Sequence, residues 1–77
     1  MAETIYVVQG FTAGKRGALQ PMQALSFPTE SQARNRAERM AATCLGVMAF
    51  AQTADVEAGE YSDPVMLVQI GRLPEQF

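Results

Sequence analysis

Two strand-forming segments of this chain are apolar on both of their faces, and this feature constrains the fold most. The first, TIYVVQGFTA over residues 4–13, carries Val7 on one parity and Val8 on the other. The second, PVMLVQIGR over residues 64–72, does the same with Leu67 and Val68. A strand with one wet face alternates apolar and polar side chains, and these two do not. Both faces of a sheet built from them therefore need a cover.

One helix is predicted over residues 30–45. Thr29 is a good N-cap, and Gln32 three residues later completes a capping-box pattern. Gly46 fits the C′ position, where a helix often ends in a left-handed conformation. Helical spacing places mostly small side chains on one face, which allows a close approach to a sheet. These residues are Ala33, Ala37, Met40, Ala41 and Cys44.

Two further strands are predicted at residues 18–27 and 47–56. The first is the weaker, and the second is also apolar on both faces. Pro21 has no N–H for a sheet ladder, so 18–27 is expected to be an edge strand or partly irregular. Turn residues precede 18–27 and 64–72, which makes two hairpins around the helix. The chain is thus expected to form a single domain over residues 1–77. Its fold class is α+β, a two-layer ββαββ arrangement of a mainly antiparallel four-stranded sheet with one helix on one face.

The face without a helix leads to a prediction of self-association. One helix covers only one face, and a second copy on a two-fold axis is the simplest cover for the other. We therefore expect a homodimer through the sheet face that the helix leaves open. The alternative is that the tail LPEQF, residues 73–77, folds back over that face. The lone Cys44 and the lack of His exclude an internal disulfide and a zinc site as other sources of stability.

Charge and hydropathy exclude several classes of protein. Residues 1–45 carry five basic and three acidic side chains, and residues 46–77 carry one basic and five acidic ones. This mild asymmetry, with a net charge of −2, makes nucleic-acid binding an unlikely function. No apolar run reaches the roughly 20 residues of a membrane span. The N-terminus lacks a basic signal-peptide region, so we expect a cytoplasmic protein with no membrane contact.

The basic residues Lys15 and Arg16 lie between two glycines in the sequence GKRG. Phosphate-binding loops need more glycines or a following helix, and neither is present. The pattern favours an exposed hairpin tip, with contact to an anion or nucleic acid as the alternative. Arginines 34, 36 and 39 are expected on solvated parts of the helix, where Glu30 and Arg34 form an i,i+4 pair.

Three glutamines, Gln9, Gln52 and Gln69, interrupt the apolar strands. If they share a face they line a polar pocket or bond across the dimer interface, and otherwise they lie in water at strand ends. Cys44 is expected to act as a small buried hydrophobe. The acidic residues Asp55, Glu57, Glu60 and Asp63 favour a solvated turn over a weak cation site, because their spacing does not match a calcium loop.

Two long segments carry a resemblance to a known family. The runs VVQGFTAGKRGAL and MAFAQTADVEAGEYSDPVMLVQIGRLPEQF resemble small uncharacterised proteins of the α-proteobacteria. The resemblance covers most of the chain and implies a bacterial cytoplasmic protein. It implies no activity and assigns no functional residues.

Three functions follow as hypotheses. The first is a non-enzymatic homodimer that acts through protein contacts, with an unidentified protein as a further partner. The second is a small-ligand or nucleic-acid binding module that uses Lys15, Arg16 and Tyr61 at loop tips. The third is a dimeric enzyme with an interface pocket lined by Tyr6 and the three glutamines. We expect no cofactor, no metal and no catalytic residue from the motifs present.

Overall fold

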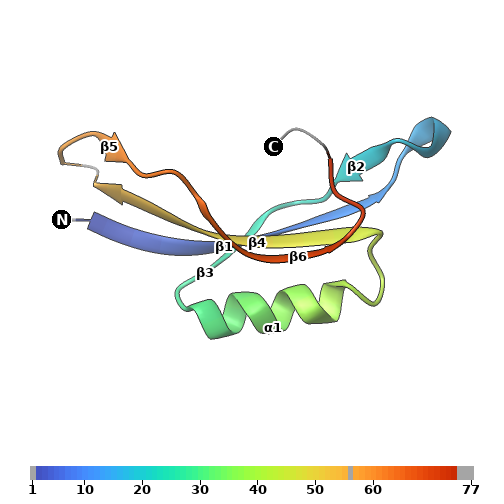
Figure 1. Ribbon diagram of the computed structural model, residues 1–77, viewed down its shortest axis with the longest axis horizontal. Helices are drawn as coiled ribbons and strands as arrows, with labels where there is room; N and C mark the ends of the chain where they lie inside the picture. Colours follow the sequence, from blue (N-terminus) through green and yellow to red (C-terminus); the bar gives the residue numbers. More distant parts are fainter. Residues whose placement is uncertain (1, 56, 75–77) are drawn as a thin grey trace.

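The computed structural model describes residues 2–55 and 57–74, and two long strands form its centre. Strand β1 (Ala2–Ala13) pairs antiparallel with β4 (Gly46–Asp55) through ten registered pairs. The pairs run from Ala2 opposite Asp55 to Phe11 opposite Gly46. Figure 1 shows these two strands as the longest elements of the molecule. Every other strand pairs with one of them.

Each long strand is followed in the sequence by two shorter strands that pair with it. β2 (Leu19–Pro21) and β3 (Leu25–Phe27) pair with β1, and β5 (Glu60–Tyr61) and β6 (Val65–Gly71) pair with β4. The short 3₁₀ turn η1 (Lys15–Gly17) joins β1 to β2. All pairings between the described strands are antiparallel. The protein is therefore α+β, with one helix and a curled antiparallel sheet of six strands.

The sheet has six strands where the sequence predicts four. The predicted strand 18–27 breaks at residues 22–24, just after Pro21, which has no N–H to donate to a ladder. In the second hairpin, β5 occupies two residues of the predicted turn. The strand predicted at 64–72 spans Val65–Gly71, and the predicted end of the 47–56 strand, Val56, lies outside the described residues.

The helix α1 spans Glu30–Met40 and begins where the sequence predicts. The Thr29 hydroxyl accepts a hydrogen bond from the backbone N–H of Gln32 at 3.3 Å. The helix ends five residues earlier than predicted, because the chain tightens into a turn in which Ala42 N–H bonds to Arg39 C=O at 3.3 Å and Thr43 N–H bonds to Met40 C=O at 3.0 Å. The prediction that Gly46 caps the helix is wrong, since Gly46 is the first residue of β4.

A close backbone contact explains Gly46 instead. A Cβ at this position would lie 1.6 Å from the Arg72 carbonyl oxygen. Gly71 has a φ of 73°, a left-handed conformation that turns the chain out of β6 and brings Arg72 against Gly46. Two glycines on neighbouring strands thus let the C-terminal segment cross the end of the sheet.

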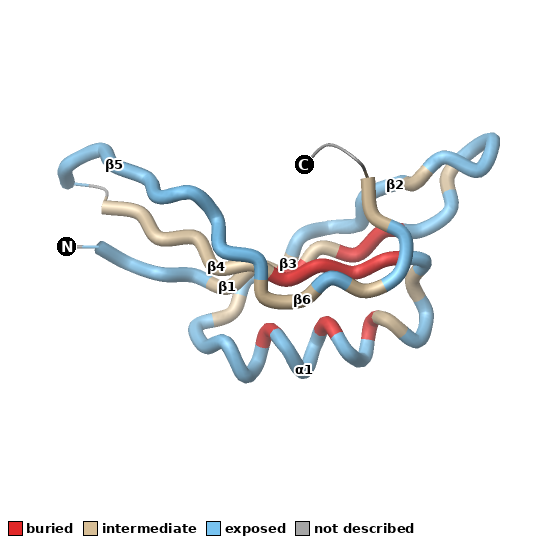
Figure 2. The backbone as a smooth tube through the Cα atoms, viewed as in Figure 1, coloured by how far each residue is buried: buried red, intermediate tan, exposed pale blue. Residues whose placement is uncertain are grey.

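The core lies between α1 and the middle of the sheet, as the buried segments in Figure 2 show. Ala33 and Ala37 of the helix are fully buried against Val8 of β1. Small helix side chains allow this close approach, as the sequence predicts. Both ends of the sheet extend past the helix, and residues 2–5 of β1 are exposed.

The opposite face of the sheet is covered at one end only. Side chains alternate along a strand, so Val7 and Phe11 face away from the helix that Val8 contacts. Phe11 is 3% exposed, and the segment at residues 72–74 rises on this side of the sheet (Figure 1). Leu73 and Pro74 are half-buried there. Two residues of the predicted covering tail are thus half-buried, and residues 75–77 of that tail lie outside the described residues.

The Gly46 contact yields a prediction. We expect Gly46→Ala to lower the free energy of unfolding by more than about 2 kcal/mol, since the Arg72 backbone must move. Gly14→Ala is the comparison and should cost less, because Gly14 has an extended backbone and its Cβ would lie 3.1 Å from the nearest atom instead of 1.6 Å. Urea unfolding measures both variants. Equal stability of the Gly46→Ala variant and the natural chain would contradict this packing.

Candidate functional site

The three predicted glutamines lie on one face of the sheet, opposite the helix. Gln9 of β1 pairs with Met48 of β4, which pairs with Gln69 of β6, so these three side chains form a row across the sheet. Gln52 pairs with Ile5 on the same face, nearer to β5. This arrangement brings Gln9 and Gln69 to either side of Met48 and leaves Gln52 apart from them.

Gln9 and Gln52 each fill a break in a neighbouring edge strand. Nε2 of Gln9 donates to the carbonyl of Met22, which lies in the break between β2 and β3, and to Gly10 C=O at 3.0 Å. Nε2 of Gln52 donates in the same way to Ser62 C=O, which lies in the break between β5 and β6. It also donates to Thr53 C=O at 3.4 Å. In each hairpin a side-chain amide thus donates to the carbonyl of a residue that lies between two edge strands.

The backbone around the two glutamines follows the same pattern. Met22 N–H donates to Gly10 C=O and Ser62 N–H donates to Thr53 C=O, both at 2.9 Å. In each hairpin the carbonyl of the residue after the glutamine therefore accepts a hydrogen bond from the N–H of the residue in the break. The geometry therefore gives Gln9 and Gln52 a structural role. Gln69 is exposed, and its side chain has no hydrogen-bond partner among the described residues.

Lys15 and Arg16 lie exposed at the tip of the first hairpin, beyond the end of the helix (Figure 1). Gly14 N–H bonds to Ala18 C=O at 2.7 Å and closes the turn. Gly17 has a φ of 76°, and Arg16 is the one non-glycine residue described with a positive φ, at 61°. The turn therefore imposes a left-handed conformation on a basic side chain, a position that glycine or asparagine normally takes.

Tyr61 lies at the other end of the molecule from this tip. The chain measures 43 Å along its longest axis, and β5 and η1 lie near its two ends (Figure 1). Tyr61 is 70% exposed, while Tyr6 packs half-buried against the core on the helix side. The structure brings neither tyrosine to Lys15 and Arg16. Within one copy of the chain these two loop tips thus lie apart.

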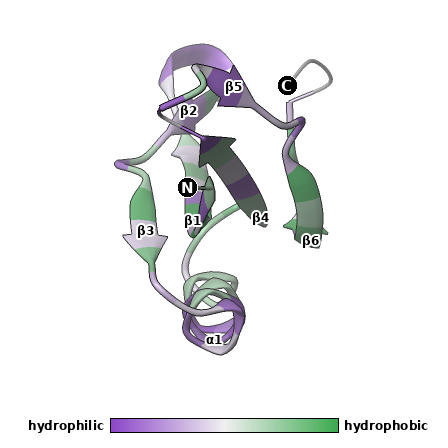
Figure 3. Cartoon of the chain, turned by 90° about the vertical axis from the view of Figure 1, so that its left-hand side faces the viewer, coloured by the Kyte–Doolittle hydropathy of each residue, from purple (hydrophilic) through white to green (hydrophobic). Residues whose placement is uncertain are grey.

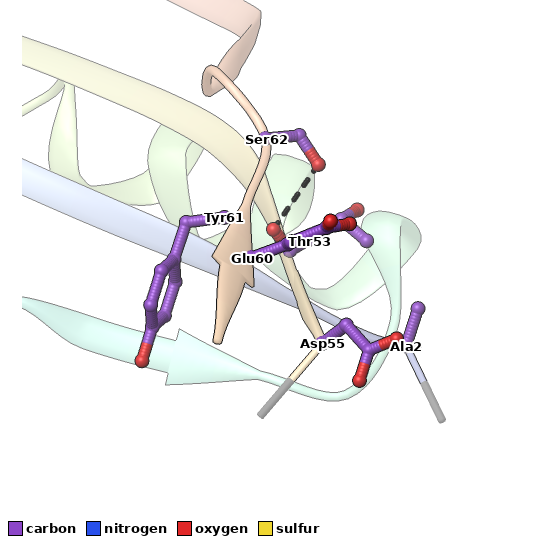
Figure 4. A pocket seen from close by; sticks show the side chains of 6 residues that line it. All are labelled: Ala2, Thr53, Asp55, Glu60, Tyr61 and Ser62. Atoms are coloured by element: carbon purple, nitrogen blue, oxygen red, sulfur yellow. Dashed lines mark hydrogen bonds between the residues drawn. The ribbon is translucent and has the colours of Figure 1, made fainter. Parts of the chain in front are cut away.

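A hollow of about 370 Å³ lies beside β5, with Thr53, Asp55 and Ser62 on its wall. Figure 4 shows the Ser62 hydroxyl donating to Thr53 C=O, at 3.2 Å, and the Tyr61 ring projecting away from Asp55. Asp55 accepts a bond from Ala58 N–H at 3.2 Å within the turn. The carboxylate and the phenol therefore point apart and do not form an acid–base pair.

A second hollow, of about 260 Å³, runs along one flank of α1 beside β3. We call it the helix-flank hollow, and the residues that line it are Phe27, Gln32, Asn35, Arg36 and Arg39. The helix pattern assigns the four polar residues to a solvated face. Sequence reasoning missed Phe27, because only the fold places this β3 residue next to them.

The ligand-type side chains of the described residues lie apart, and Cys44 lies at the edge of the core. No group of three metal-ligating side chains occurs within 2–55 and 57–74. Cys44 is half-buried against the core, with its Sγ 3.4 Å from the Met22 sulfur. No described helix has the length and hydropathy to cross a membrane.

Comparison with known proteins adds no assignment. No protein-family model matches the chain, and no curated protein and no solved structure is significantly similar to it.

The glutamine bonds can be tested by mutation. We expect Gln9→Met to lower the free energy of unfolding by about 0.5–1.5 kcal/mol, because the exposed carbonyl of Met22 exchanges its amide donor for water. Gln69→Met is the matched control on the same face and should change stability by less than about 0.5 kcal/mol. Thermal and urea unfolding report both values. Equal effects at the two positions would show that Gln9 does not close the break.

The hairpin tip gives a further prediction. Arg16→Gly should raise the free energy of unfolding by about 0.5–1 kcal/mol, since glycine adopts the left-handed conformation without the cost of a Cβ. Lys15→Gly should lower it, because Lys15 has an ordinary backbone and glycine adds entropy to the unfolded chain. Urea unfolding of both variants checks this opposite pair, and a loss of stability in both would contradict the turn geometry.

Proposed function

We propose that this protein is a non-enzymatic homodimer that acts through protein contacts, and that its two copies meet through the sheet face opposite α1. The observation that carries the proposal is the exposed apolar surface on that face, where Ile5 is 47% and Met66 is 40% exposed. A contiguous exposed apolar patch on a small protein marks an interaction surface.

The shape of the molecule supports the same proposal. Its radius of gyration is 13.4 Å, compared with about 11.5 Å for a compact domain of this length. The molecule measures 43 × 24 × 16 Å, and both ends of its sheet extend past the helix. Such a thin sheet with a single helix layer offers a broad surface to a partner.

The chemistry of the open face suits a second copy of this chain. Val7, Phe50 and Met66 form an apolar row across the three strands, and Met66 is 40% exposed. The neighbouring Ile5 is 47% exposed on the same face. Glu3 lies at the end of this face, and no charged side chain lies on it along β1 from Ile5 to Phe11 or along β6. Two copies can therefore meet through the middle of the face without like-charge repulsion.

The small core gives the dimer a thermodynamic role. Three of the eight buried hydrophobic residues are alanines, namely Ala33, Ala37 and Ala49. A small domain with so little buried apolar volume gains stability from a partner that binds only the folded state. The resemblance to small α-proteobacterial proteins and the free Cys44 support a bacterial cytoplasm as the place of action.

Sedimentation analysis of single-residue variants tests the proposal. The natural chain should sediment with a mass of twice 8.4 kDa. The Met66→Glu variant should sediment with a mass of 8.4 kDa, because a dimer would bury the new charge in its interface. Val65→Glu is the matched control, since Val65 is the next residue, 61% exposed, and faces the helix side of the sheet. Circular dichroism checks that both variants fold. A natural chain with the mass of one copy at micromolar concentration would overturn the proposal.

A further inference from the structure

We propose that the helix-flank hollow binds a small oxyanion, a phosphate or a carboxylate, that is attached to one flat ring. The hollow is lined by residues of α1 and by Phe27 of β3, and β3 forms one edge of the sheet and leads down toward the helix (Figure 3). It has four polar side chains on the helix and one aromatic wall on β3. These two kinds of group would recognise the two parts of such a ligand.

The oxyanion would bind to Arg36 and Arg39. The two residues are three apart and therefore lie side by side, one turn apart on the helix. Neither has a carboxylate partner among the described residues, whereas Arg34 pairs with Glu30 at 2.8 Å. Two like charges at this spacing repel each other, and an anion between them removes the repulsion. Guanidinium groups also match the geometry of phosphate and carboxylate oxygens.

The ring would lie against Phe27. Phe27 pairs with Tyr6 and faces the helix side of the sheet, where it is half-buried at the edge of the core. Gln32 and Asn35 add amide donors and acceptors next to it. An apolar wall with a few convergent polar groups is typical of small-molecule sites. A hollow of about 260 Å³ is below the usual size for drug-like ligands, which favours a ligand with a single ring.

This site is independent of the proposed dimer. The helix-flank hollow lies on the helix side of the sheet, and the proposed interface lies on the opposite side. A dimer would therefore leave both copies of the hollow accessible. Failure of the dimer would not affect the binding experiment, and failure of binding would not affect the sedimentation result.

A nuclear magnetic resonance titration of the ¹⁵N-labelled full chain tests the inference. The probes are phenyl phosphate, benzoate and inorganic phosphate, and the first two distinguish a phosphoryl from a carboxylate ligand. We expect phenyl phosphate or benzoate to shift the backbone signals of residues 32–39 with a dissociation constant on the order of 1 mM. Inorganic phosphate should bind at least about tenfold more weakly, because it has no ring to contact Phe27.

Charge-matched variants separate the site from general attraction between charges. Arg36→Gln with Arg39→Gln should abolish the shifts, and Lys15→Gln with Arg16→Gln should leave them unchanged although it removes the same charge from an exposed tip. Equal loss of binding in the two double variants would overturn the proposal. So would equal affinity for inorganic phosphate and phenyl phosphate, or the absence of shifts at residues 32–39 with every probe.

Discussion

The antiparallel ladder between β1 and β4 is the constraint on which the rest of the structure depends. Its ten pairs align the two longest strands, and every other strand is an edge piece on one of them. The same ladder decides which side chains meet α1, since a shift by one residue would exchange the two faces. Val8 and Ala49 are opposite each other in this register and both pack under the helix. Val7 and Phe50, which are paired next to them, therefore lie on the face opposite the helix.

Both edges of this sheet are interrupted, and the two interruptions are closed by the same device. A glutamine side chain on the central strand donates to the carbonyl of the residue in the break. The N–H of that same break residue donates to the carbonyl of the residue that follows the glutamine. Gln9 and Gln52 thus allow the edge strands to bend while the central ladder stays continuous. Short, bent edges also limit uncontrolled pairing with other chains. These interrupted edges agree with the proposed dimer, which uses a face of the sheet instead.

The sequence predicts the local features of this fold better than those that depend on distant contacts. The helix start was predictable because Thr29 and Gln32 are three residues apart and interact directly. The role of Gly46 was not, because it depends on Arg72, which reaches it only through the turn at Gly71. The glutamine bonds were equally hidden, since the positions of the strand breaks are set by the ladder. The helix-flank hollow needs Phe27 of β3 beside the helix, and no spacing in the sequence indicates that neighbour.

The central claim is that one helix covers one face of the sheet and a second copy covers the other. Nuclear Overhauser effects between a labelled and an unlabelled copy in a mixed sample test it most directly, because they report contacts between chains alone. The account predicts such effects from the methyl groups of Ile5, Val7 and Met66. It predicts none from Ala33 and Ala37, which are buried under the helix of their own chain. Effects confined to the helix, or none at all in a sample at millimolar concentration, would contradict it.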